Sequence, residues 1–191
     1  MTTLILGLIL FLGVHSMQIA AAGWRGTVIA RRGERVWKGL YSVVALVGLV
    51  LIVVGYGLAR QQPVVLYTPP PALRHLALLV LVPVFPLLFA AQMPSRIKNA
   101  VKHPMLLATK LWALAHLLAN GTAADVLLFG GFLVWAVADR VSVKRRAASA
   151  SPAVQPPPPR NDLIALIGGL ALYALFLFWG HAWLIGVSPL G

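Results

Sequence analysis

The sequence predicts an all-α membrane protein, a polytopic bundle of about six transmembrane helices with both termini in the periplasm. The 191 residues are 60% hydrophobic and only 10% charged, and several apolar runs are long enough to cross a bilayer. Basic residues lie almost entirely in alternate connections between those runs. The chain contains no cysteine, which excludes disulfides, iron–sulfur clusters and thiolate ligands.

The first three predicted spans occupy the N-terminal half of the chain. Residues 2–22 form the first, and because no basic residue precedes them we expect a retained helix rather than a cleaved signal peptide. The second and third spans are predicted over residues 40–58 and 73–92. Pro83 and Pro86 remove backbone hydrogen bonds from the third span and should kink it.

The other three spans follow in the C-terminal half. The fourth covers residues 105–119, the Asn120-Gly121 pair after it is a turn signal, and the fifth continues to about residue 139. Residues 140–162 are basic and rich in Ala, Ser and Pro, which predicts a flexible cytoplasmic loop. The sixth span is predicted over residues 163–185. We expect residues 1–191 to form a single transmembrane domain.

The distribution of lysine and arginine predicts the orientation. The connections after the first, third and fifth spans hold nearly all of these residues, whereas the other connections and both termini hold almost none. Cytoplasmic loops carry the excess of basic residues, so we expect three cytoplasmic loops in a bacterial inner (cytoplasmic) membrane. The same placement accounts for the net charge of +12. We therefore expect the lipid bilayer, and no nucleic acid, as the partner.

Two of the five histidines lie well inside predicted spans, His15 in the first and His116 in the fourth. An imidazole inside a bilayer is costly without a partner, so both are candidate functional residues. At about 1.5 Å of rise per residue, His15 lies roughly 10 Å from the cytoplasmic end of its span, and His116 roughly 15–18 Å from the end of its own. Histidines at similar depth on different helices can hold a haem from both faces.

A haem-ligating imidazole also needs an acceptor for its second N–H. Four neighbouring side chains are candidates to support the two ligands: Ser16, Gln18, Trp112 and Asn120. The alternative is that His15 and His116 each make a helix–helix hydrogen bond and bind no metal. The remaining histidines lie at a membrane edge, in a basic loop and among tryptophans, and we expect surface or interfacial roles for them: His75, His103 and His181.

Several segments resemble the NnrU family of membrane proteins: LGVHSMQIAAAGWRG, GERVWKGLYS, MPSRIKNAVKHPMLLATKLWALAHLLANG and LLFGGFLVWAV. The resemblance covers residues 1 to about 140 and, more loosely, the sixth span. That family includes bacterial proteins linked to denitrification and the ζ-carotene isomerases of plants and cyanobacteria. For the isomerase branch the resemblance implies haem b held by two histidines, which correspond to His15 and His116. That branch has a cysteine three residues before the second histidine, where this chain has Ala113.

Three functions follow as hypotheses. The resemblance implies either a redox-gated cis–trans isomerase of a polyene such as ζ-carotene, or a non-enzymatic haem protein. The latter would support nitrite or nitric oxide reduction by maturation, electron supply or sensing. The third hypothesis is a cofactor-free transporter or scaffold, with Asp125 near the start of the fifth span as its candidate proton or substrate site.

Overall fold

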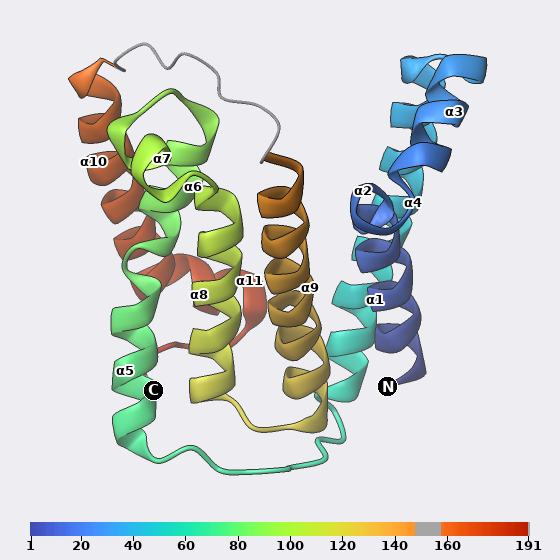
Figure 1. The fold of residues 1–191 in the computed structure, drawn as a ribbon. Helices are drawn as coiled ribbons and strands as arrows, with labels where there is room; N and C mark the ends of the chain where they lie inside the picture. The colour runs from blue at the N-terminus through green and yellow to red at the C-terminus, as the bar shows by residue number, and fades with distance from the viewer. Residues whose placement is uncertain (148–157, 191) are drawn as a thin grey trace. The chain divides into compact units, whose positions relative to one another are not determined.

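The computed structural model describes residues 1–147 and 158–190, and these residues are helical apart from short connections and one isolated β-bridge (Figure 1). The prediction of an all-α fold is therefore confirmed. The chain divides into two compact units. Unit 1 combines Met1–Thr68 with Asn120–Val143, and unit 2 combines Pro69–Ala119 with Lys144–Gly191.

Unit 1 contains α1 (Thr2–His15), α2 (Met17–Ala20), α3 (Ala22–Arg32), α4 (Glu34–Ala59) and most of α9 (Ala123–Ala147). The first helix ends at His15, earlier than the expected span over residues 2–22. Two local features explain the difference. The Ser16 hydroxyl donates to the Leu12 carbonyl at 2.6 Å, and Ala21 has the non-helical angles φ −141° and ψ 41°. Side chains that bond to the backbone in this way compete with regular helix, so the polar end of the apolar run turns away from α1.

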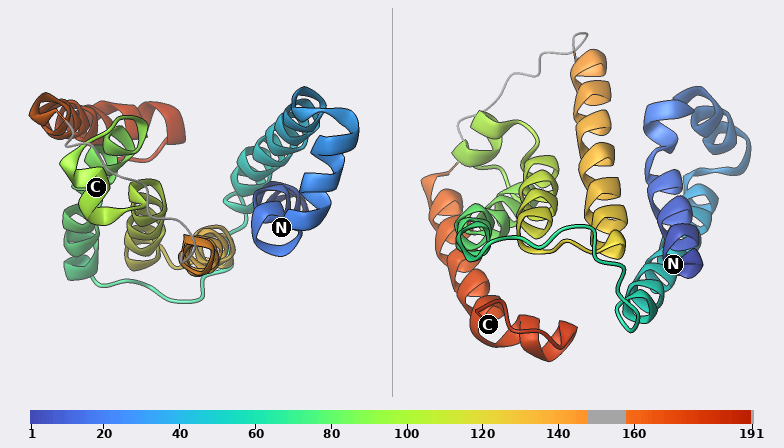
Figure 2. Two further views of the ribbon diagram at one scale, coloured as in Figure 1. Left: turned by 45° about the horizontal axis from the view of Figure 1, so that its top comes forward. Right: turned by 90° about the horizontal axis from the view of Figure 1, so that it is seen from below.

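Helices α1 and α4 pack directly against each other in unit 1 (Figure 2). Glycines allow this approach. A Cβ added at Gly55 would lie 2.3 Å from the Leu4 backbone nitrogen, and one at Gly48 would lie 2.7 Å from that of Phe11. Small residues at such positions let two helix backbones come close enough for extensive van der Waals contact. This contact fixes the position of His15 at the end of α1.

The predicted turn at Asn120-Gly121 is confirmed, since α8 ends at Ala119 and α9 begins at Ala123. The backbone N–H groups of Leu66 and Tyr67 donate to the Gly121 carbonyl at 2.8 and 3.1 Å. A Cβ at residue 121 would collide with the Tyr67 carbonyl oxygen, so only glycine suits this contact.

Unit 2 contains α5 (Pro71–Leu81), α6 (Val84–Gln92), α7 (Arg96–Val101), α8 (Pro104–Ala119), α10 (Pro159–Leu175), the π-helical turn η1 (Phe176–Gly180) and α11 (His181–Ile185).

The expected kink in the third span is confirmed as a break between α5 and α6 at Val82–Pro83. The Val82 N–H bonds to Leu79 instead of continuing the α-helical pattern to Leu78. The Tyr173 hydroxyl donates to the freed Leu78 carbonyl at 2.8 Å, which satisfies the group in an apolar setting.

A small apolar core holds α6 and α8 together in unit 2. Trp112 packs against a cluster whose buried members are Val84, Leu87 and Ala108. On the other side of α6, a Cβ at Gly169 would lie 2.4 Å from Pro86, so α10 also approaches α6 closely. These contacts hold the helix that carries His116.

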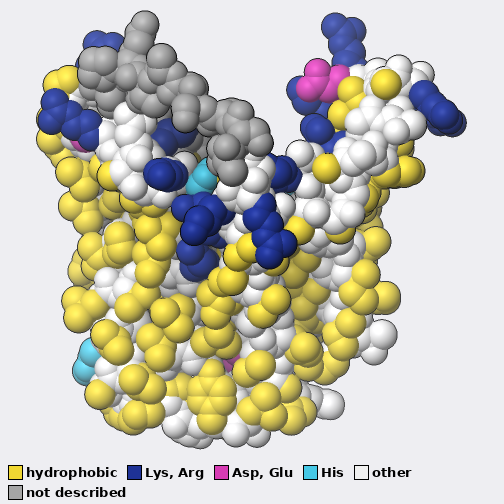
Figure 3. All heavy atoms as spheres, in the orientation of Figure 1, with side chains coloured by type: hydrophobic (Ala, Val, Ile, Leu, Met, Phe, Trp, Pro, Cys, Tyr) yellow, Lys and Arg dark blue, Asp and Glu magenta, His cyan; other side chains and the backbone are white. Residues whose placement is uncertain are grey.

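Four helical stretches are long and apolar enough to cross a membrane: Glu34–Ala59, Pro71–Gln92, Ala123–Arg146 and Pro159–Ile185. Thr2–His15 and Pro104–Ala119 are shorter apolar helices. Large apolar side chains are exposed on these helices in both units, as lipid contact requires (Figure 3). Six spans and periplasmic termini remain predictions. The expected loop over residues 140–162 is shortened by α9 and α10, and its central residues, 148–157, lie outside the described residues.

Candidate functional site

His15 is the last residue of α1, and an aromatic cluster of unit 1 surrounds its ring. Its Nδ1 lies 2.6 Å from the Phe11 carbonyl oxygen, one helical turn earlier. A carbonyl can only accept, so Nδ1 must carry the proton, and in the neutral ring Nε2 then holds the lone pair. The rings of Phe11, Tyr41 and Trp135 lie 4.2, 5.2 and 6.0 Å from the imidazole between centroids. The histidine is thus fixed in one tautomer and one orientation.

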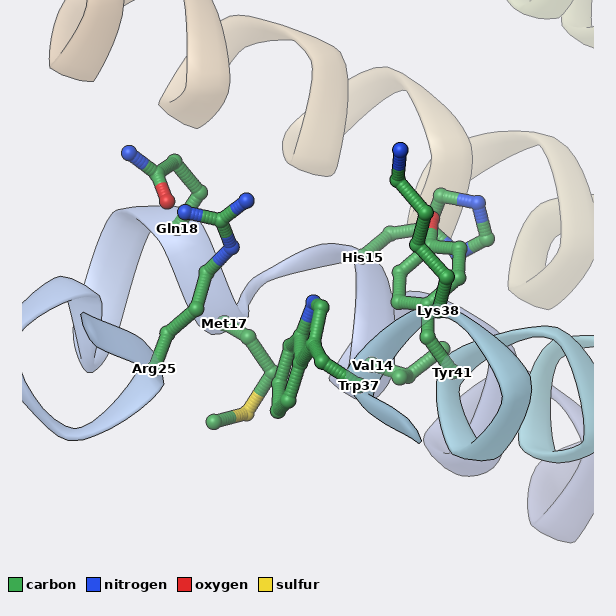
Figure 4. A pocket seen from close by; sticks show the side chains of 8 residues that line it. All are labelled: Val14, His15, Met17, Gln18, Arg25, Trp37, Lys38 and Tyr41. Atoms are coloured by element: carbon green, nitrogen blue, oxygen red, sulfur yellow. The ribbon is translucent and has the colours of Figure 1, made fainter. Parts of the chain in front are cut away.

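A pocket of about 260 Å³ opens beside His15 (Figure 4). Its lining combines two cations, two aromatic rings, an amide and a thioether around the imidazole: Val14, His15, Met17, Gln18, Arg25, Trp37, Lys38 and Tyr41. Figure 4 shows Lys38 and Tyr41 next to His15, with Arg25 and Gln18 beyond Trp37. The pocket is therefore apolar at its walls and positively charged at its edge.

Trp135 contributes an unsatisfied donor to the same region. Its indole lies edge-on to the His15 ring, at an interplanar angle of 89°. The Nε1 atom is buried and has no hydrogen-bond partner among the residues that the structure describes. Buried polar groups are normally paired, so this indole N–H is a donor that a bound ligand can use.

His116, on α8 in unit 2, repeats the backbone arrangement of His15. Its Nδ1 lies 2.8 Å from the Trp112 carbonyl oxygen, again one turn earlier, so Nδ1 carries the proton here too. The Trp112 ring lies 5.2 Å from the imidazole. Ala113, on the same helix, is fully buried. Both histidines predicted as ligands are therefore held as the Nδ1–H tautomer by their own helices.

The structure adds a third imidazole that the sequence analysis assigned to the interface. His181 lies with its ring 6.5 Å from that of His116, at an interplanar angle of 28°. Its Nδ1 lies 2.6 Å from the Val187 carbonyl oxygen, which the left-handed Gly186 (φ 76°) brings back toward the ring. The preceding π-helical turn η1 closes when the His181 N–H bonds to Phe176. Such turns occur frequently at functional sites.

Comparison with known protein families shows to which family the chain belongs. The model of one family, described as NnrU protein, matches residues 3–189, which is nearly the whole chain. The chain belongs to the NnrU family. No curated protein and no solved structure matches it. The NnrU match includes all three histidines described above.

In this NnrU chain the four predicted supporting residues take different positions. The Ser16 hydroxyl bonds to Leu12 rather than to His15, while Gln18 lines the pocket beside His15. Trp112 supports His116 through its backbone carbonyl and its ring. Asn120 lies just beyond the end of α8, in the connection to α9.

Asp125 of the NnrU chain is buried, with 4% of its surface exposed, so it is not a solvated residue at the membrane edge. Its carboxylate accepts from the Tyr56 hydroxyl at 2.5 Å and from the Thr122 N–H and hydroxyl at 2.9 and 2.6 Å. The Thr122 hydroxyl in turn accepts from the Asp125 N–H at 3.3 Å. This reciprocal pairing resembles a capping box and fixes the start of α9.

Among the described residues, no group of three or more His, Cys, Asp or Glu could hold a bare metal ion. A haem differs in its needs, since the macrocycle supplies four ligands and the protein only the axial ones. His15 and His116, each with Nδ1–H bonded to a backbone carbonyl, are ligands of the kind that an axial position takes. The residues present thus suit a haem better than a protein-ligated ion.

Proposed function

We propose that this NnrU protein binds a b-type haem within the membrane, with His15 and His116 as the axial ligands. One observation carries the proposal. Each imidazole donates from Nδ1 to the carbonyl four residues earlier, at 2.6 Å for His15 and 2.8 Å for His116. Metal-ligating histidines commonly donate their other ring N–H to such an acceptor. This bond fixes the ring and raises the basicity of the nitrogen that ligates the metal.

The binding must be non-covalent, because a chain without cysteine has no thioether attachment site. When bound, the haem supplies a redox-active iron whose reactivity depends on its axial ligands. The chain itself contributes two oriented imidazoles and an aromatic cluster that packs around the His15 ring. Its apolar helices provide the low-dielectric surroundings.

The activity that we assign to this site is cis–trans isomerisation of a lipophilic polyene, as the resemblance to the isomerase branch implies. The exposed apolar faces of the helices support a substrate that arrives from the bilayer. Asp125, the candidate site of the transporter hypothesis, is instead occupied by Tyr56 and Thr122 at the start of α9. This makes a cofactor-free transporter the weaker reading.

The absorption spectrum of the purified protein tests haem binding. We expect a six-coordinate low-spin spectrum and a pyridine haemochrome of the b type. His15→Ala should give a high-spin spectrum or loss of haem, and the His15/His116 double alanine variant should lose most of its haem. His75→Ala, at an exposed position of α5, is the matched control. Full haem content in the double variant would exclude these two ligands.

A second assay separates the isomerase from a non-enzymatic haem protein. Reduced, haem-loaded protein is incubated in the dark with a cis polyene, and the isomers are separated by chromatography. Conversion that depends on reduction and on His15 supports the isomerase. No conversion by fully loaded, reduced protein would leave haem binding intact and exclude the polyene reaction.

A further inference from the structure

The pocket beside His15 contains two cationic side chains whose charges are poorly compensated. Arg25 lies with its guanidinium carbon 5.9 Å from the centre of the Trp37 ring, and no carboxylate pairs with it among the described residues. Lys38 pairs with Glu34 at 3.0 Å, but both side chains are well exposed, at 70% and 63%. An ion pair in water is weak, so Lys38 can exchange its partner at little cost.

The position of the pocket defines which part of a ligand it can hold. It lies where apolar α1 ends and the basic helix α3 follows, with Trp24 and Trp37 packed edge to face at 5.8 Å. Tryptophan pairs of this kind are typical of the boundary between lipid and water. A ligand that reached His15 from the apolar side would therefore present its polar end to Arg25 and Lys38.

The size of the pocket leads to the same conclusion. Its volume of about 260 Å³ is below the range of sites that enclose a whole organic ligand. It is suited to one polar edge of a larger molecule. Trp37 separates the two cations in Figure 4, so the pocket offers two points of positive charge rather than one.

We infer that this pocket binds the two carboxylates of the haem whose iron His15 ligates. The inference rests on the proposed haem binding and adds the residues that orient the macrocycle. Arg25 and Lys38 bind the carboxylates by charge-assisted hydrogen bonds, which are the strong class of such bonds. The amide of Gln18 and the hydroxyl of Tyr41 supply further donors at the same edge. Anionic oxygens of a lipid phosphate present the same chemistry, so the test must separate the two sources.

Titration with haem and with its dimethyl ester, in which both carboxylates are masked, makes that separation. Wild-type protein in detergent should bind haem more tightly than the ester. In the variant Arg25→Gln/Lys38→Gln the affinity for haem should fall on the order of tenfold or more, from the loss of hydrogen bonds to charged groups. The affinity for the ester should stay unchanged, so the preference for haem disappears. Comparing the two ligands on each protein cancels the greater solubility of the ester in detergent.

Arg31→Gln/Arg32→Gln is the matched control, because it removes the same charge from α3 outside the pocket. It should keep the wild-type preference for haem. An equal preference for haem over the ester in wild type and in Arg25→Gln/Lys38→Gln would overturn the inference. So would loss of co-purified anionic lipid from that variant with the preference intact, which would assign the pocket to a lipid phosphate. Absence of binding of either compound to wild type would instead refute the proposed haem function itself.

Discussion

The surroundings of His15 and His116 agree in one respect and differ in two. Both rings donate from Nδ1 to a carbonyl one helical turn earlier. His15, however, lies beside a cationic pocket and is the only histidine of unit 1. His116 has a second imidazole, that of His181, at 6.5 Å between ring centres.

Because of this difference, we expect the two sides to contribute differently to ligand binding. The His15 side has the charges needed to orient an anionic ligand, and the His116 side has a spare nitrogen donor. Under the proposed function, the loss of one histidine should therefore not have the same effect as the loss of the other. Unit 1 has no second imidazole, whereas unit 2 has one beside His116.

The largest expected effect follows from this asymmetry. His15→Ala should abolish the six-coordinate spectrum, while His116→Ala should retain part of it because the His181 ring can reach a neighbouring position. Adding His181→Ala to His116→Ala should remove the remainder. Haem content and the ferric low-spin bands measure both outcomes. Identical spectra for His116→Ala with and without His181→Ala would show that His181 is no substitute.

A second contrast concerns two glycines of α4, of which one contacts α1, the helix that ends at His15. Gly55→Ala places a Cβ 2.3 Å from the Leu4 backbone, so α1 must move, at a cost of about 1–3 kcal/mol. Gly57→Ala, two residues further on α4, meets nothing within 4 Å and should be neutral or slightly stabilising. Thermal unfolding in detergent measures both variants. Equal midpoints for the two would contradict the close approach of α1 and α4.

The smallest expected effect compares one tyrosine from each unit. Tyr56 donates to the buried Asp125 carboxylate, and Tyr173 donates to the Leu78 carbonyl freed at the proline break. A hydrogen bond to a charged group contributes about 1.5–3 kcal/mol and a neutral one about 0.5–1.5 kcal/mol. Tyr56→Phe should thus destabilise the protein by about 1 kcal/mol more than Tyr173→Phe. Urea unfolding in detergent checks the order, and the reverse order would contradict the stronger bond assigned to Tyr56.

Hydrophobicity and proline placement are properties of the residues themselves, and they predicted the apolar helices and the break at Val82–Pro83. The end of α1 at His15 was not predictable in the same way. The run remains apolar on average to residue 22, and the helix stops because Ser16 and Ala21 adopt local backbone geometry that hydropathy does not register.

The candidate site was predictable only in part. His15 and His116 stand out in the sequence because a titratable ring in an apolar run is unusual. The sequence predicts side-chain acceptors for their second N–H groups. The backbone carbonyls of Phe11 and Trp112 take that role instead, and any residue at those positions has a carbonyl. The approach of His181 to His116 depends on packing between helices far apart in the sequence, which no local pattern encodes.

The π-helical turn at Phe176–Gly180 has a consequence for the spacing of the C-terminal sequence. A π-turn contains one residue more than the α-turn that would replace it. If the same residues instead formed regular α-helix, the helix after this stretch would be rotated by about 100°. The ring of His181 would then leave the side of the helix that meets His116. The pairing of these two rings in this sequence therefore depends on the π-turn, which takes up one extra residue and keeps His181 on the side that meets His116.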